Sequence, residues 1–191
     1  MSPLDAAHLL LATVGSRNVK DSATIVGRPG GLVSSAGKWA PSFVNIPELI
    51  GLPADHSFAD ALEALIAAAS NGSLQRAAEE LEQAQVDLVR DAAPALNIEV
   101  SLYGPVPRGA ILIEEIVTDN EGQQHRYRDH WDRHFYGERS VVKKSGNLAW
   151  IDIARPAEMD SDLKTVSTFT HRTIATIGAL LAGDTPPNTA A

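Results

Sequence analysis

The chain has no cysteine among its 191 residues. Disulfide bridges, thiolate metal sites and cysteine nucleophiles are therefore excluded. Aromatic residues make up only 5% of the sequence, and no apolar run approaches the roughly 20 residues that a bilayer-spanning helix needs. The N-terminus lacks the basic segment and the apolar segment that together form a signal peptide. From these absences we expect a cytoplasmic protein that does not enter a membrane.

Basic residues are also scarce, since 16 Lys and Arg stand against 24 Asp and Glu and give a formal net charge of −8. This excess of acidic residues disfavours non-specific binding to nucleic acid, because such binding needs many contacts between basic side chains and phosphates. Residues 125–144 are an exception, with six basic and three acidic side chains. A basic segment on an acidic chain can still contact a phosphate or an acidic partner, so nucleic-acid binding stays an alternative. The simpler interpretation is a solvated hairpin with ordinary arginines.

The first half of the sequence has the pattern of helices. Ser2 with Asp5, and Ser57 with Asp60, predict a capping box at two helix N-termini. Gly and Pro interrupt residues 27–53 too often for a long element, so we expect an irregular loop there, whose role the sequence leaves open. Four apolar residues are expected to hold this loop to the core: Trp39, Phe43, Val44 and Ile46. Helices are predicted at 3–14, 18–26, 58–70 and 73–93.

From Asn97 onward, apolar residues alternate with polar ones as they do in strands. Strands are predicted at 97–103, 110–118, 123–128, 140–144, 148–154 and 163–169, followed by a helix at 170–182. This order predicts an α+β fold in which N-terminal helices pack on an antiparallel five- to six-stranded meander, closed by a C-terminal helix. We expect one domain over 1–183, divided into a mainly helical half (1–96) and the meander plus helix (97–183), and a disordered tail at 184–191.

The stretch from Gln124 to Arg139 stands out because it combines three of the six histidines with four aromatic residues and four arginines. Tyr, Trp and Arg are enriched at the centres of protein interfaces. No catalytic pattern accompanies them, so we assign no catalytic residue and favour a surface that binds another protein or a second copy of this chain. Stacking on unpaired bases is the alternative. The predicted binding residues are Arg126, Tyr127, Arg128, Trp131, Arg133, Phe135, Tyr136 and Arg139.

The histidines of this stretch support a different hypothesis. His130 and His134 are four residues apart and share one face if 129–136 is helical, while His125 could supply a third nitrogen from the preceding strand. Such a centre would bind Zn²⁺ or Mn²⁺ and activate water in a hydrolase that acts on a nucleic acid or a nucleotide.

Two further features bear on this metal hypothesis. Asp129 or Asp132 could add an oxygen ligand, or could hydrogen-bond a ligating histidine. The zinc-protease pattern, however, requires Glu directly after the first histidine, and Trp131 occupies that position. The principal prediction is therefore a protein without a cofactor, and the Zn²⁺ or Mn²⁺ enzyme is the alternative.

Three segments of the sequence are similar to segments of other proteins: SPLDAAHLLLA at 2–12, VKDSATIV at 19–26 and LKTVSTFTHRTIATIGALLAG at 163–183. They resemble segments of uncharacterised phage and prophage regulator-like proteins. The resemblance includes no catalytic motif and implies a regulatory setting in a mobile element. Together with the 124–139 stretch, it leads us to expect a non-enzymatic regulatory or adaptor protein. A metal-dependent hydrolase and a nucleic-acid-binding protein are the alternatives.

Overall fold

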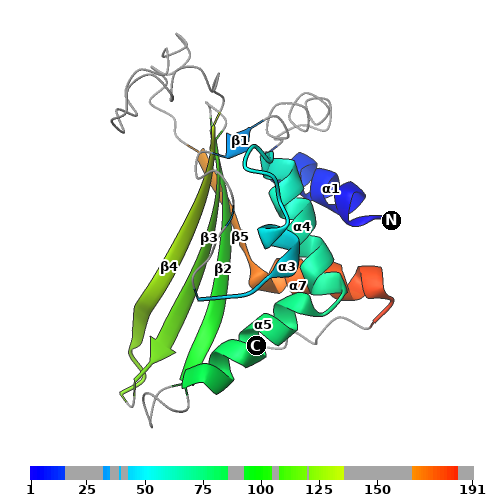
Figure 1. Cartoon of the computed structure of the whole chain (residues 1–191). Helices are drawn as coiled ribbons and strands as arrows, with labels where there is room; N and C mark the ends of the chain where they lie inside the picture. Colours follow the sequence, from blue (N-terminus) through cyan, green and yellow to red (C-terminus); the bar gives the residue numbers. More distant parts are fainter. Residues whose placement is uncertain are drawn as a thin grey trace.

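The described part of the chain forms two layers, an antiparallel sheet of five strands and a set of helices (Figure 1). A computed structural model describes residues 1–15, 32–34, 39, 43–85, 93–104, 108–119, 121–135 and 165–184. The elements predicted at 18–26, 140–144 and 148–154, and residues 185–191 of the predicted tail, lie outside the described residues. Among the described helices, none is both long and apolar enough to cross a lipid bilayer.

Three long strands form the centre of the sheet as successive hairpins, as the sequence predicts for a meander. Among the described strands the order is β1-β4-β3-β2-β5, so the short β1 and the last strand β5 are the outermost two, and each pairing is antiparallel. The strands are β1 (Val33–Ser34), β2 (Ala93–Gly104), β3 (Arg108–Thr118), β4 (Gln124–Phe135) and β5 (Thr165–Thr170). The α+β class is confirmed. The short strand β1 lies within residues 27–53, for which the sequence predicts only an irregular loop.

All described helices lie on one side of the sheet (Figure 1). They are α1 (Pro3–Gly15), α3 (Pro47–Ile50), α4 (Phe58–Ser70), α5 (Ser73–Gln85) and α7 (His171–Ala182). Both predicted capping boxes are formed. At α4, the Ser57 N–H donates to Asp60 Oδ2 at 2.7 Å, and the Asp60 N–H donates to Ser57 Oγ at 3.1 Å. These reciprocal bonds satisfy amides that a helix N-terminus leaves free, so they fix where α4 begins.

The hydrophobic core lies between α4 and the sheet. Leu62, Leu65 and Ile66 of α4 are fully buried, as are Ile98 of β2 and Ile111 of β3. Three of the four apolar residues predicted to hold the loop are buried in this core and the fourth is partly buried against it: Trp39, Val44, Ile46 and Phe43. The core thus holds the loop in front of α4 against the sheet.

Strand β4 is longer than the strand predicted at 123–128. It continues to Phe135, so the hypothesis of a helical turn from Asp129 onward is wrong over the described residues. Each residue from Asp129 to Phe135 pairs with a residue of β3, and one bulge lies beside Glu115 and Ile116. The hydrogen-bonded ladder to β3 therefore decides the conformation, although the inner face of this half of β4 is polar.

Candidate functional site

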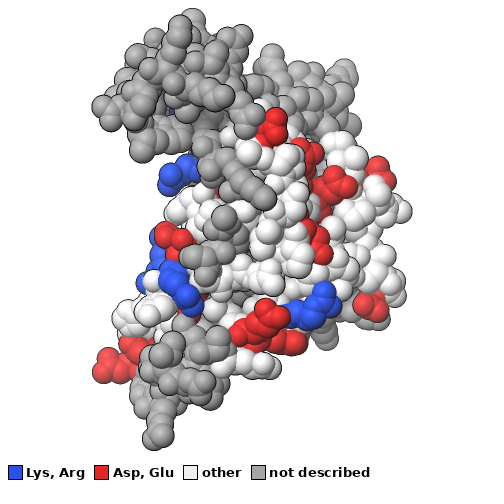
Figure 2. Space-filling view, in the orientation of Figure 1, with Lys and Arg blue, Asp and Glu red and all other residues white. Residues whose placement is uncertain are grey.

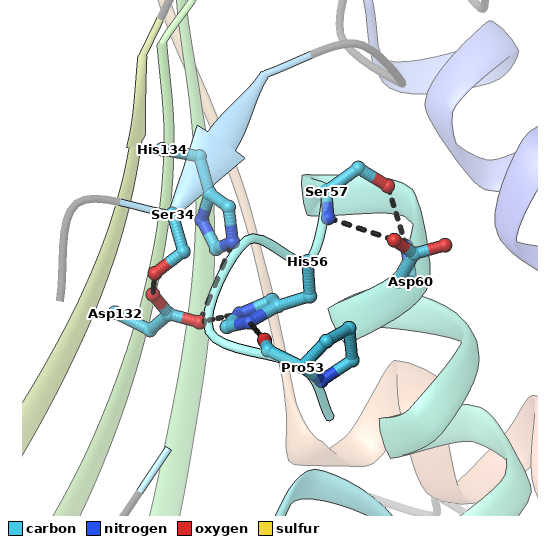
Figure 3. Close-up of polar contacts among 7 residues, drawn as sticks. All are labelled: Ser34, Pro53, His56, Ser57, Asp60, Asp132 and His134. Carbon is cyan, nitrogen blue, oxygen red and sulfur yellow. Dashed lines mark hydrogen bonds and ion pairs between the residues drawn. The ribbon is translucent and has the colours of Figure 1, made fainter. Parts of the chain in front are cut away.

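Strand β4 carries the predicted site, and its two faces have different surroundings. Side chains alternate along a strand. The inner face, with His130, Asp132 and His134, points toward the helices, where Asp132 meets His56 of the turn before α4 (Figure 3). The outer face carries Trp131 and the neighbouring odd-numbered residues. One strand therefore presents a buried set of side chains and a set that lies away from the helical layer.

The inner face ends in a buried polar cluster of Ser34, His56, Asp132 and His134 (Figure 3). Ser34 Oγ donates to Asp132 Oδ1 at 2.6 Å. His56 Nε2 lies 2.7 Å from Asp132 Oδ2, and His134 Nε2 lies 3.4 Å from the same oxygen. The side chains of both histidines and of the aspartate have 0% exposure. Asp132 is therefore the centre on which the other three side chains converge.

Segments far apart in the sequence supply this cluster. Ser34 lies opposite His134 in the short pairing of β1 with β4. The Ser34 N–H donates to the His56 carbonyl oxygen at 3.0 Å, which ties β1 to the turn before α4. His56 directly precedes Ser57, the N-cap of α4. The capping box thus positions the residue next to it, and β1 connects that residue to the end of β4.

Both ring nitrogens of His56 face oxygen atoms. Nδ1 lies 2.8 Å from the Pro53 carbonyl, which only accepts, and Nε2 faces Asp132. A neutral imidazole has a single N–H, so the His56–Asp132 pair holds one proton more than a neutral ring and a carboxylate would. Burial lowers the pKa of His56, but the hydrogen bond and charge of Asp132 outweigh burial and raise it. Burial raises the pKa of Asp132, but the hydrogen bond from His56 and the neighbouring His134 and Ser34 lower it. We therefore describe the pair as imidazolium and carboxylate.

His134 is different, because its ring is neutral. Burial lowers the pKa of His134 to about 4, against the opposing charge of Asp132. Its ring packs edge-on against Phe58, with ring centroids 5.1 Å apart, and against His56 at 5.3 Å. Neither ring nitrogen has a hydrogen-bond partner among the described residues. Leaving a buried polar group unpaired costs about 1–3 kcal/mol, so the unpaired His134 ring lowers the free energy of unfolding.

The structure does not bring the three predicted metal histidines together. His125 is 63% exposed and lies 2.7 Å from Asp119. It is nine residues from His134 along one strand, a distance of about 30 Å at the usual rise per residue. His130 packs against the Trp39 ring at 4.5 Å. Among the described residues, the acidic and histidine side chains that could hold a metal are instead His56, Asp132 and His134, whose donor atoms all lie within 4.8 Å of one another.

The outer face of β4 holds the predicted binding residues that remain accessible. The Arg133 guanidinium lies 4.8 Å from the centre of the Trp131 ring, and Trp131 Nε1 donates to Asp129 at 3.2 Å. Trp131 is partly buried and Arg133 is exposed. At the bulge, Tyr127 is 65% exposed, and the Arg128 guanidinium lies 5.5 Å from its ring. Arg128 itself lies two residues before His130, on the inner face, where its guanidinium is also 5.3 Å from the centre of the Phe43 ring. On the outer face, the aromatic–arginine pair is therefore Trp131 with Arg133.

Carboxylates neutralise two of the arginines that made this segment look basic. Arg126 forms ion pairs with Glu114 and Asp129, and Arg128 with Glu115. Basic side chains along the sheet lie next to acidic ones on the face shown in Figure 2. The structure places Phe135 at the end of β4 opposite Arg108. The other two predicted binding residues, Tyr136 and Arg139, lie outside the described residues.

Comparisons with known proteins add no assignment to this geometry. No protein-family model, no curated protein and no solved structure matches the chain. The function therefore has to be argued from the side chains themselves.

Two members of the buried cluster are absent from the sequence-based site. His56 has a local signal, because it directly precedes a capping box and is thus held in a defined position. Ser34 has no such signal, since its place depends on a two-residue strand in a loop rich in Gly and Pro. Asp132 appears in the sequence-based hypothesis as an oxygen donor, and its inner position is compatible with that role.

Proposed function

We propose that the chain is a non-enzymatic adaptor protein that binds a protein partner along β4. The observation that carries this proposal is the pairing of Trp131 with Arg133 on the outer face, with the exposed Tyr127 ring farther along the same strand. Trp, Tyr and Arg dominate the binding energy of protein interfaces because they bury a large area and also form polar contacts. A regulatory role in a mobile element is part of the proposal and rests on the resemblance to phage and prophage segments.

The edge of β4 supports the same proposal. β1 pairs only with His134 and Phe135. From Gln124 to Arg133, therefore, no described strand lies on the second side of β4. A strand edge offers unpaired N–H and C=O groups, to which an extended segment of a partner can add as a further strand. The Trp131 and Arg133 side chains would then contact the partner's side chains on the outer face.

A nucleic-acid partner has less support. Binding to a phosphate backbone requires cations that can exchange counterions for phosphates. Arg126 and Arg128 are already paired with carboxylates. The chain also has a net charge of −8, which repels a polyanion.

The proposal is tested with the full-length chain as an affinity bait. The variant Trp131→Ala/Arg133→Ala removes the ring and the guanidinium from the outer face. The matched control is Val166→Ala, since Val166 is 57% exposed on β5 at the opposite edge of the sheet. We expect a partner that is retained by the wild type and the control and is reduced at least about 10-fold by the double variant, a loss typical of interface hot spots.

Self-association is measured in parallel by light scattering coupled to size exclusion. A wild-type dimer that the double variant converts to a monomer identifies a second copy as the partner. If the double variant retains every protein that the wild type binds, and its mass is also unchanged, the surface on β4 is not the binding site. Thermal melting of each variant checks that the fold is intact.

A further inference from the structure

The buried cluster on the inner face of β4 has the composition of a metal site. It offers two imidazole nitrogens and one carboxylate oxygen, from His56, His134 and Asp132, with donor atoms within 4.8 Å of one another. Two histidines and a carboxylate are a common ligand set for Zn²⁺ in proteins. Hard cations such as Mg²⁺ and Ca²⁺ prefer six or more oxygen ligands, which this set does not provide.

The distances in the cluster are close to those around a tetrahedral ion. Zn–N and Zn–O bonds of about 2.0–2.2 Å place neighbouring ligand atoms roughly 3.3–3.5 Å apart. His134 Nε2 and Asp132 Oδ2 are 3.4 Å apart and already match. His56 Nε2 and Asp132 Oδ2 are 2.7 Å apart, because they are hydrogen-bonded, and must separate by a little over half an ångström. Of these two pairs, one already has the tetrahedral spacing and the other needs this small separation, while all three donor atoms lie within 4.8 Å of one another.

Two hydrogen bonds orient two of the three ligands, His56 and Asp132, in the way that is usual in metal sites. The Pro53 carbonyl accepts from His56 Nδ1, which directs Nε2 toward Asp132. Ser34 Oγ donates to Asp132 Oδ1, which leaves Oδ2 for the two histidines. Ligating histidines in metal sites usually donate their second N–H to a carbonyl or a carboxylate, and ligating carboxylates are themselves hydrogen-bonded.

His134 supplies an independent observation. Its side chain is fully buried, and Nε2 points at Asp132 without a hydrogen-bond partner among the described residues (Figure 3). A protein core rarely keeps such a group without a reason. A purely structural network formed by Ser34, His56 and Asp132 is complete without it. Metal ligation gives the lone pair of His134 a partner and explains why the ring is there.

We propose that His56 Nε2, Asp132 Oδ2 and His134 Nε2 bind one Zn²⁺ ion, which displaces to solvent the proton that His56 Nε2 shares with Asp132. The ion is independent of the interaction proposed for the outer face of β4. It connects the turn before α4 to the end of β4, two segments far apart in the sequence. All three ligands have 0% exposed side chains. The proposed role is therefore to stabilise the junction of these segments.

The proposal is tested on the full-length chain after treatment with EDTA, with Zn²⁺ as the probe in isothermal titration calorimetry. We expect one Zn²⁺ per chain, and no comparable binding of Mg²⁺ or Ca²⁺. His134→Gln and His56→Gln are expected to weaken binding by on the order of 100-fold or more, and Ser34→Ala by about 10-fold. The matched control is His125→Gln, which removes an exposed histidine from a His–Asp pair of the same 2.7 Å length on the same strand.

A second measurement does not depend on whether the variants fold. Long-range ¹H–¹⁵N spectra of the wild-type imidazoles are recorded while Zn²⁺ is added. The Nε2 signals of His56 and His134 are expected to shift together at one equivalent, while those of His125 stay in place. The proposal is overturned if Zn²⁺ does not bind, if it shifts His125 instead, or if folded His134→Gln binds it as tightly as the wild type.

Discussion

Asp132 shows how a charge is kept in the inner layer of this protein. Moving an unpaired carboxylate out of water is very costly, so a buried one needs hydrogen bonds and a counter-charge. Ser34 and His56 supply these to Asp132. His134 adds no hydrogen bond, although its proximity lowers the pKa of Asp132, and burial keeps its own ring neutral. At the scale of single residues, the two histidines therefore respond to pH in opposite ways.

The neutral His134 predicts that stability falls as the solution is acidified. In the folded protein its pKa is about 4, against an ordinary value of 6.5. Between these values the unfolded chain binds the proton and the folded protein does not. The contribution of His134 is thus complete above pH 6.5 and decreases as the pH falls toward 4, by roughly 3 kcal/mol in all. Urea denaturation at pH 7, 5.5 and 4.5 in EDTA measures this decrease.

Other groups change little in that window or have the same sign. His56 has a raised pKa, so its contribution is complete below 6.5 and is lost only at higher pH. Asp132 has a lowered pKa, so its contribution is lost only as the pH falls below about 4. Burial also lowers the pKa of His130 and of His171, so these two groups cause part of the loss of stability on acidification in the wild type and in His134→Gln alike. In His134→Gln the decrease should therefore be smaller than in the wild type; equal decreases would contradict the assignment.

At the scale of elements, the strength of the local signals decided what the sequence could predict. The capping boxes at α1 and α4 involve residues three positions apart, so the sequence alone predicts where these two helices begin. The second half of β4 was not, because the usual alternation assumes an apolar inner face. Here that face carries His130, Asp132 and His134, so no period of two in hydrophobicity marks the strand. These three polar residues therefore removed the hydrophobic pattern by which the second half of β4 could have been predicted as a strand.

The crossing of α4 with β3 supports the cluster and yields a second prediction. Gly109 lies opposite His134 in the β3–β4 pairing, and the Phe58 ring covers it. A Cβ at Gly109 would be 2.5 Å from Phe58 Cδ2. Gly109→Ala is therefore expected to lower the free energy of unfolding by about 2 kcal/mol, as overpacking in a core does.

A double-mutant cycle distinguishes this clash from a general loss of strand stability. Phe58→Leu replaces the ring with a smaller side chain, so Gly109→Ala should cost less in the Phe58→Leu background than in the wild type. For residues in contact, the coupling is expected to be between about 0.5 and 3 kcal/mol. Urea denaturation of the four proteins provides it. Additive effects would show that Gly109 is needed for a reason other than the Phe58 ring.

At the scale of the whole molecule, the class and the layers were predictable, but the buried site was not. Successive hairpins and a terminal helix follow from the order of the periodic segments. The order β1-β4-β3-β2-β5, by contrast, places the first strand beside the fourth. Only this non-local pairing brings Ser34 to Asp132, and nothing in the sequence near Ser34 indicates it. A site built from β1, a turn and β4 therefore needs the complete sheet order before it can be recognised.

Helix α7 joins the end of the described chain to its first half, and this contact gives the last prediction. Gly178 of α7 packs so closely on α4 that a Cβ there would be 2.6 Å from the Ala69 Cβ. Gly178→Ala must push the two helices apart, and we expect a loss of about 2 kcal/mol. For a chain of this size that loss lowers Tm by about 4–8 °C. The control is Leu180→Ala, because Leu180 lies on the same helix but is 58% exposed and should change stability by less than about 0.5 kcal/mol. If calorimetry shows one transition that shifts as a whole, α7 unfolds together with the sheet and the buried cluster. A separate early transition in Gly178→Ala would instead show that α7 is dispensable for the rest of the fold.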